Sequence, residues 1–144
     1  MIIIKSLEKF GTNIEGKIND NSSLGEWYRL FREKRLNQLS DEDLPKAIRQ
    51  SLFLPYIIPL ALARLKRFPA AGYLYDGELL NALSLVPISF WQSHDATRAL
   101  VVDFIRYLKK VLPLRHEWTY ESDEPDFYKS LATLEANLRE GVGH

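Results

Sequence analysis

The fold is limited most by the stretch from Leu52 to Ala63, LFLPYIIPLALA, in which almost every side chain is apolar. It is too short to cross a membrane, which takes about 20 apolar residues. A helix that is apolar all round has to be buried all round, so the stretch predicts the central helix of a helical bundle. Pro55 fits the first turn of this helix, Pro59 lies near its start or kinks it, and Phe68-Pro69 ends it.

Other segments carry apolar residues at the three- and four-residue spacing of an α-helix. We expect such helices over residues 23–36, 40–52, 76–85, 95–112 and 124–140, with Ile88 to Trp91 as a short turn. Residues 1–22 form an irregular lead-in, in which Ile2–Ile4 make a short strand or a buried arm and Ser6–Phe10 make one helical turn. The sequence therefore predicts an all-α fold, a single-domain bundle of about six helices over residues 1–144.

Local signals predict where these helices begin. Ser23 and Glu26 have the spacing of a capping box, and Asp76 and Asp95 are the natural caps of their helices. Pro45 follows the Ser40–Asp43 start signal so closely that either Asp43 is the cap or the first turn is distorted. In the helix after Asp95, we expect the inward stripe to comprise Ala99, Val102, Ile105 and either Leu108 or Lys109, widened by Leu100, Phe104, Tyr107 and Val111.

The overall charge excludes few functions but disfavours one. Lys and Arg number 19, as do Asp and Glu, so the formal net charge is zero, whereas nucleic-acid binders usually carry a basic excess. The chain has no cysteine, which fits a reducing compartment, and its N-terminal Ile2–Ile4 is too short an apolar run for a signal peptide. We therefore expect a cytoplasmic protein with no membrane partner and no direct nucleic-acid partner.

No set of residues in the sequence predicts catalysis or metal binding. His94, His116 and His144 lack metal-ligand spacing, and neither a phosphate-binding glycine loop nor a nucleophile elbow is present. We expect no enzyme activity, cofactor, metal or small-molecule substrate. One alternative stays open, a small hydrolase or ligand-binding domain with a polar site near Asp76, Glu78 and His94.

A basic helix end is followed directly by an acidic segment. Residues Arg98 to Arg115 are rich in cations, which leaves an RNA-binding helical module as a second alternative. The acidic segment is either a solvated helix start or a docking surface for a basic partner, and its aromatic residues are either interface or core residues. The partner-binding candidates are Glu117, Trp118, Tyr120, Glu121, Asp123, Glu124 and Asp126.

Three motifs in the middle third of the chain occur together in a known family. Ile48-Arg49-Gln50, the apolar run around Pro59 and Tyr75-Asp76-Gly77-Glu78-Leu79-Leu80 follow one another between Leu44 and Leu85, with Gly72 in the turn before the last motif. In this combination the chain resembles the immunity proteins of bacterial contact-dependent growth inhibition (CDI) systems. Pro45 and Pro55 depart from the pattern, and the two flanking thirds match nothing in it.

The resemblance implies a cytoplasmic antidote that binds one cognate toxin domain, at the C-terminus of a paired surface protein, and neutralises it. Toxins of such systems are often RNases that act on tRNA, so an acidic surface on the antidote would occlude a cationic active site by presenting phosphate-like charge. The motif residues would hold the bundle together and need not touch the toxin; they are Arg49, Gln50, Pro59, Tyr75, Asp76, Gly77 and Glu78.

Overall fold

The computed structural model describes residues 2–10 and 22–142, and the all-α prediction is confirmed there. The elements are the 3-10 helices η1 (Ile4–Phe10) and η2 (Leu36–Gln38) and the α-helices α1 (Ser23–Phe31), α2 (Asp43–Arg49), α3 (Leu54–Arg67), α4 (Glu78–Ser84), α5 (Ile88–Ser93), α6 (Asp95–Val111) and α7 (Asp123–Glu140). The turn formers within residues 11–21 of the predicted lead-in, and His144, lie outside the described residues.

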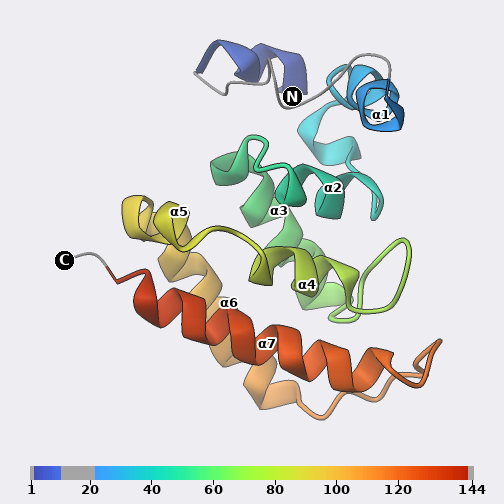
Figure 1. The fold of residues 1–144 in the computed structure, drawn as a ribbon, viewed down its shortest axis with the longest axis vertical. Helices are drawn as coiled ribbons and strands as arrows, with labels where there is room; N and C mark the ends of the chain where they lie inside the picture. The colour runs from blue at the N-terminus through green and yellow to red at the C-terminus, as the bar shows by residue number, and fades with distance from the viewer. Residues whose placement is uncertain (1, 11–21, 143–144) are drawn as a thin grey trace.

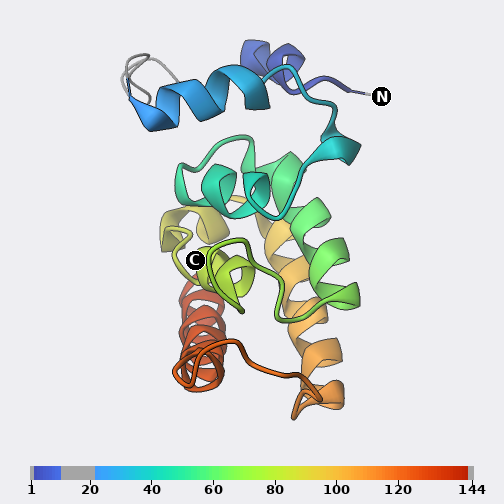
Figure 2. The same cartoon turned by 90° about the vertical axis from the view of Figure 1, so that its right-hand side faces the viewer.

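The helices are stacked along the long axis of the molecule (Figures 1 and 2). At one end lie η1 and α1, at the other end lie α6 and α7, and α2 to α5 lie between them. Helix α3 contacts α2, α4, α6 and η2, while α4 packs on α7 and α2. Within the described residues, no helix combines the length and the apolar character that crossing a membrane requires.

Helix α3 is central in its contacts, but the prediction that it is buried on all sides is wrong. Pro55, Pro59 and Ala63 form an exposed stripe at four-residue spacing, and Tyr56 is also exposed. A proline inside a helix leaves the carbonyl four residues earlier without its usual donor. Here Pro59 and Pro55 lie on the open face, so the sequence places the helix-distorting residues where water is available.

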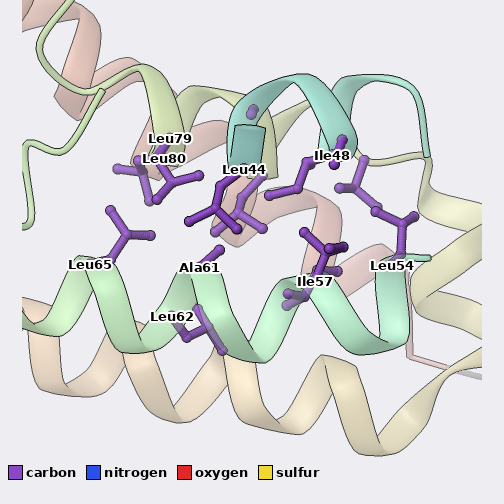
Figure 3. Packing of buried hydrophobic residues seen from close by; sticks show 14 of the residues in the cluster. Leu44, Ile48, Leu54, Ile57, Ala61, Leu62, Leu65, Leu79 and Leu80 are labelled. Atoms are coloured by element: carbon purple, nitrogen blue, oxygen red, sulfur yellow. The ribbon is translucent and has the colours of Figure 1, made fainter. Parts of the chain in front are cut away.

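The opposite face of α3 builds the core (Figure 3). Ile57, Ala61 and Leu65 are completely buried, and they pack in one cluster with Ile48 of α2 and Leu79 of α4. Burying a Leu or Ile side chain contributes about 1.5–3 kcal/mol, so this cluster is the main stabilising feature of the middle layer. The cluster also fixes the position of α4, whose N-terminus carries the acidic motif residues.

Helix α1 ends at Phe31, four or five residues earlier than the periodicity predicts. The reason is the N-terminal arm, which lies antiparallel to the segment after α1 through a bridge between Ile3 and Arg35. The amides of Ile4 and Lys5 donate to the carbonyls of Lys34 and Arg32, each at 2.9 Å. These carbonyls therefore bond to the N-terminal arm and do not accept the hydrogen bonds of a longer α1. The predicted arm and helical turn are therefore both present, with Ile4 buried and η1 following the bridge.

Three predicted helix caps differ in the structure, one of them at α6, where the cap position is His94 and Asp95 is the first helical residue. The cap of α1 is Ser22, one residue before Ser23, and its Oγ accepts from the Gly25 amide at 3.0 Å. The cap position of α4 is Gly77, whose φ of 86° lies in the left-handed region, and Asp76 turns its carboxylate elsewhere. At the start of α2 the cap position is Glu42 and Asp43 is the first helical residue, and Ser40 and Asp43 bond reciprocally to each other's amides.

The region around α6 brings two further corrections. Residues expected as a turn form the short helix α5, Ile88–Ser93, and its Trp91 is completely buried. The buried face of α6 comprises Thr97, Val101, Phe104, Ile105 and Leu108, whereas Ala99, Leu100, Tyr107 and Val111 are exposed and Val102 is half-buried. Phe104, Ile105 and Leu108 are buried as predicted, and the rest of the stripe differs because α6 packs on α3, α5 and α7, so tertiary contacts set its inward direction.

We predict that Gly72→Ala destabilises the fold by about 2 kcal/mol through overpacking. A Cβ at this position would overlap the Tyr75 carbonyl oxygen and lie 2.8 Å from Glu78 Cβ, and the carbonyl belongs to the backbone and cannot rotate away. Urea unfolding of both proteins measures the difference. A stability equal to that of the unaltered chain would show that the turn between α3 and α4 adjusts freely.

Candidate functional site

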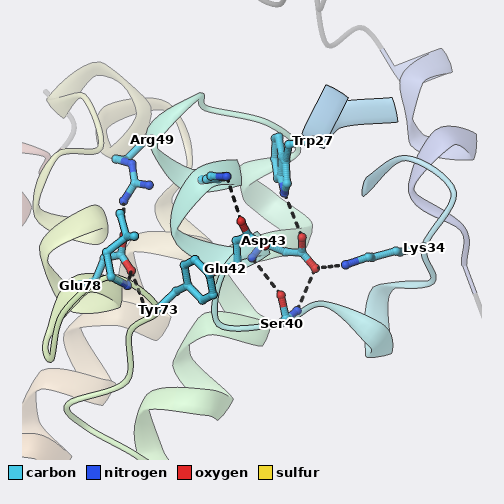
Figure 4. Close-up of polar contacts among 10 residues, drawn as sticks. Trp27, Lys34, Ser40, Glu42, Asp43, Arg49, Tyr73 and Glu78 are labelled. Carbon is cyan, nitrogen blue, oxygen red and sulfur yellow. Dashed lines mark hydrogen bonds and ion pairs between the residues drawn. The ribbon is translucent and has the colours of Figure 1, made fainter. Parts of the chain in front are cut away.

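The carboxylate of Glu78, at the start of α4, organises the turn that precedes this helix (Figure 4). The Glu78 side chain is buried, accepts from Arg49 Nη1 at 3.0 Å, and receives the amides of Tyr73 and Leu74 at 2.8 and 3.0 Å. Arg49 lies at the end of α2 and is partly exposed, so one half-buried ion pair and the two amide bonds join α2, α4 and the turn between α3 and α4. This pairing leaves the side chains of Tyr73 and Leu74 exposed, by 59% and 63%.

The carboxylate of Asp76 joins this turn to the segment after α6. Its Oδ2 lies 3.1 Å from His116 Nε2 and accepts from the amide and the hydroxyl of Thr119 at 2.9 and 3.0 Å. Burial alone would raise the pKa of Asp76, but the hydrogen bonds from Thr119 and His116 outweigh it and hold the pKa below its usual range. The turn that contains Asp76 therefore contacts the segment after α6 at His116 and Thr119, although more than 40 positions separate Asp76 from Thr119.

Three of the predicted partner-binding residues hold the acidic segment in place. Trp118 is half-buried, packs its ring on Phe127 at 5.5 Å, and donates from Nε1 to Glu124 at 3.1 Å. Asp123 is only 5% exposed and accepts from the Tyr120 amide at 3.2 Å. Because their polar groups bond within the loop and the start of α7, we propose that Trp118, Asp123 and Glu124 hold this segment in place and do not contact a partner.

The remaining candidates are exposed, and we name the surface that they form with the neighbouring turn the acidic face. Tyr120 is 59% exposed, and Glu117, Glu121 and Asp126 make no ion pair within the described part of the chain. Exposed aromatic and apolar side chains surrounded by charge are typical of protein interfaces. The acidic face comprises Tyr73, Leu74, Glu117, Tyr120, Glu121 and Asp126.

The sequence analysis missed Tyr73 and Leu74. The signal that could have found them is an apolar pair between Gly72 and the charged motif, where a turn is expected and burial is not. Their link to the acidic segment has no local signal, because it depends on the contact of Asp76 with Thr119.

The other motif residues lie in the framework around this face. Gln50 caps the end of α2, and Pro59 lies on the exposed side of α3. The Tyr75 hydroxyl accepts from Asn81 Nδ2 at 2.9 Å, within the α4 region. We propose that these residues, with Arg49, Gly77 and Glu78, shape the protein and do not contact a partner.

The structure does not assemble the alternative polar site around Asp76, Glu78 and His94. Asp76 bonds to His116 and Thr119, Glu78 bonds to Arg49, and the ring of His94 stacks on Phe90 at 4.0 Å and approaches the Phe90 carbonyl. Among the described residues, no group of three or more His, Asp or Glu side chains could hold a metal ion. The three side chains thus serve separate local contacts.

A second buried carboxylate, Asp43, connects α1 to α2 (Figure 4). Its side chain is 1% exposed and accepts from Trp27 Nε1 at 3.0 Å, Lys34 Nζ at 2.6 Å and the Ser40 amide at 3.0 Å. Burial alone would raise its pKa, but the bonds from Lys34, Ser40 and Trp27 together lower the pKa below its usual range. The sequence identified Asp43 only as a possible cap, because Trp27 and Lys34 are distant in the chain.

We predict that Asp43 contributes to acid unfolding. A carboxyl whose pKa is lower in the folded chain than in the unfolded chain stabilises the fold at pH values above its unfolded pKa. This stabilisation is lost as the pH falls through the pKa of the folded chain, which for Asp43 lies below the usual value of about 4. Asp43→Asn should therefore be less stable at neutral pH and lose less stability between pH 5 and pH 2. Thermal melts across this range measure both slopes, and identical slopes would contradict the role assigned to Asp43.

The comparison with known protein families gives a match over most of the chain. The family model described as CDI immunity proteins matches residues 10–101, which include α1 to α5, both buried carboxylates, and Tyr73 and Leu74 of the acidic face. The match ends within α6, before the acidic segment. None of the curated proteins compared with this chain matches it.

Proposed function

The chain belongs to the CDI immunity proteins, a family whose members bind a cognate toxin, and from this premise we propose that the acidic face makes the contact. The proposal rests on the bonds between Asp76 and Thr119, which join two segments that carry exposed aromatic, apolar and acidic side chains. One such surface accommodates one toxin domain, so we propose a one-to-one complex in the cytoplasm of the cell that makes both proteins.

We further propose that the cognate toxin is an RNase, and that the acidic face occludes its active site. An RNase holds a polyanion and therefore needs a cationic cleft. Glu117, Glu121 and Asp126 are exposed carboxylates without an ion pair in the described part of the structure, and they can present negative charge to such a cleft. Tyr73 and Tyr120 add the large apolar contact area that anchors tight interfaces.

The extent of the family match fits this division of roles. The pair of Arg49 and Glu78 lies inside the matched range, as do Tyr73 and Leu74, whereas the acidic residues and Tyr120 of the face lie outside it. A common framework with a variable surface is what a set of antidotes needs when each one neutralises a different toxin. We propose that the chain acts by binding alone and catalyses no reaction.

Co-expression with the toxin domain encoded beside it tests this function. Cells that make the toxin domain and this chain should grow, and the purified pair should elute as one complex of one copy each. Cells that make the toxin with an unrelated immunity protein provide the control and should stop growing. Growth arrest despite full expression of this chain, together with no complex, would refute toxin neutralisation; protection with the toxin's RNA cleavage still active in the complex would refute occlusion.

A further inference from the structure

A second surface feature lies away from the acidic face, in the seam between α6 and α7. It is a groove of about 350 Å³, which we name the basic groove, and both helices line it. The ion pair between Lys109 and Glu135, at 2.6 Å, lies at one end of the groove, and Arg98 and Val142 lie toward the other. None of the residues that line this groove belongs to the acidic face.

The floor of the basic groove is aliphatic. Val102 and Ile105 come from α6, and Leu138 and Val142 come from α7. Val142 is 50% exposed and Val102 is half-buried, so part of this apolar surface faces solvent. Contact with an apolar partner surface would remove that area from water, which is favourable in proportion to the area covered.

The rim of the groove is cationic. Arg98, Arg106, Lys109 and Arg139 line it, and Glu135 is the acid among the lining residues. Glu135 already bonds to Lys109, and the pair of Arg106 with Asp103 is highly exposed on both sides, so it neutralises little. Arg139 forms no ion pair with the described residues.

Arg98 gives the most specific indication of a ligand. Its Nε is buried and has no hydrogen-bond partner in the described structure, and the nearest carboxylate, Asp95, lies 3.9 Å from it. The guanidinium of Arg98 is partly exposed in the groove, so it can donate charge-assisted hydrogen bonds to the carboxylate of a partner.

We propose that the basic groove binds an acidic amphipathic helix of a protein partner. The lining residues of α6 run from Arg98 to Lys109, which corresponds to about 16 Å along the helix axis and therefore to about three turns of a bound helix. An apolar stripe on that helix covers the aliphatic floor, and flanking carboxylates meet the arginines, as in other helix-in-groove complexes. RNA fits less well because the described residues that line the groove include no aromatic side chain on which a base could stack.

The test uses the full chain without any toxin, so its result is independent of the proposed function. The probe is a fluorescein-labelled helical peptide of about four turns, with leucines at i, i+3, i+4 and i+7 and glutamates on both flanks. A scrambled peptide of equal composition and a single-stranded RNA oligomer are the comparison probes. Fluorescence anisotropy should show that the amphipathic peptide binds at least tenfold more tightly than either.

Variants localise the binding. Arg98→Gln and Arg139→Gln should each lower the affinity for the peptide at least tenfold. Lys110→Gln removes the same charge at an exposed position of α6 outside the groove and should leave the affinity unchanged. Arg139 is exposed and keeps the test valid if Arg98→Gln fails to fold. The proposal would be overturned if the scrambled peptide bound equally well or if RNA bound more tightly. It would also be overturned if the chain self-associated and changing Glu117 and Glu121 to lysine abolished the self-association, because the groove would then bind the acidic face of a second copy.

Discussion

Changing Glu117 and Glu121 together to lysine should weaken binding of the cognate toxin domain about a hundredfold, or about 2.7 kcal/mol, and should barely change thermal stability. Both side chains are exposed and form no ion pair in the described structure, so the fold does not depend on them. Against a cationic toxin surface, each substitution replaces an attraction with a repulsion. Calorimetric titration of both proteins with the toxin domain measures the loss.

A matched control separates a local effect from a change in overall charge. Glu33→Lys with Glu140→Lys makes the same charge change at exposed positions outside the acidic face. This control should bind the toxin with an affinity close to that of the unaltered chain. For the unaltered chain, the association rate should also fall as salt is added, because screening weakens electrostatic steering. Equal losses for both double variants would contradict a specific role for Glu117 and Glu121.

Replacing Glu78 with alanine should destabilise the fold by about 1–3 kcal/mol, the cost expected when an acceptor is removed and its hydrogen-bond donors lose their partner. The substitution leaves Arg49 without its carboxylate and leaves the amides of Tyr73 and Leu74 without their acceptor. Because the same contacts hold the exposed side chains of Tyr73 and Leu74 in place, the variant should also bind the toxin less tightly at temperatures where it remains folded. Urea unfolding and toxin titration measure the two effects.

The partner substitution provides the control for Glu78. Arg49→Ala removes the cation but leaves both amides bonded to Glu78, so it should cost less than Glu78→Ala. In the double variant the two losses should not add, because the residues interact directly. Additive losses, or a cost for Glu78→Ala below 1 kcal/mol, would show that the turn between α3 and α4 is held by other contacts.

The helices that the sequence predicted well are those whose signals are local. The apolar periodicity after Phe127 and the stop at Gly141 gave α7, and Pro113 gave the end of α6. The predictions that failed depend on distant parts of the chain. Helix α1 ends at Phe31 because the N-terminal arm forms hydrogen bonds with the segment that follows Phe31. The inward face of α6 is set by the helices packed around it.

The candidate site shows the same limit. Composition identified the acidic segment and its aromatic residues, but it could not separate the residues that hold the loop, such as Asp123, from those that face solvent, such as Glu121. It also assigned Asp76 to a helix cap, because a cap is the usual role of an aspartate before a helix. The bond from Thr119 to Asp76 forms only in the folded chain, and it is this bond that joins Tyr73 and Leu74 to the acidic segment.

Amide hydrogen exchange on the free chain and on its complex with the cognate toxin domain tests the toxin-binding surface most directly. If the acidic face makes the contact, peptides that cover residues 73–76 and 117–126 should exchange more slowly in the complex. Peptides from η1 and α1, at the far end of the molecule in Figure 1, should exchange at the same rate in both states. Slower exchange at η1 and α1 without any change at residues 73–76 and 117–126 would contradict the account.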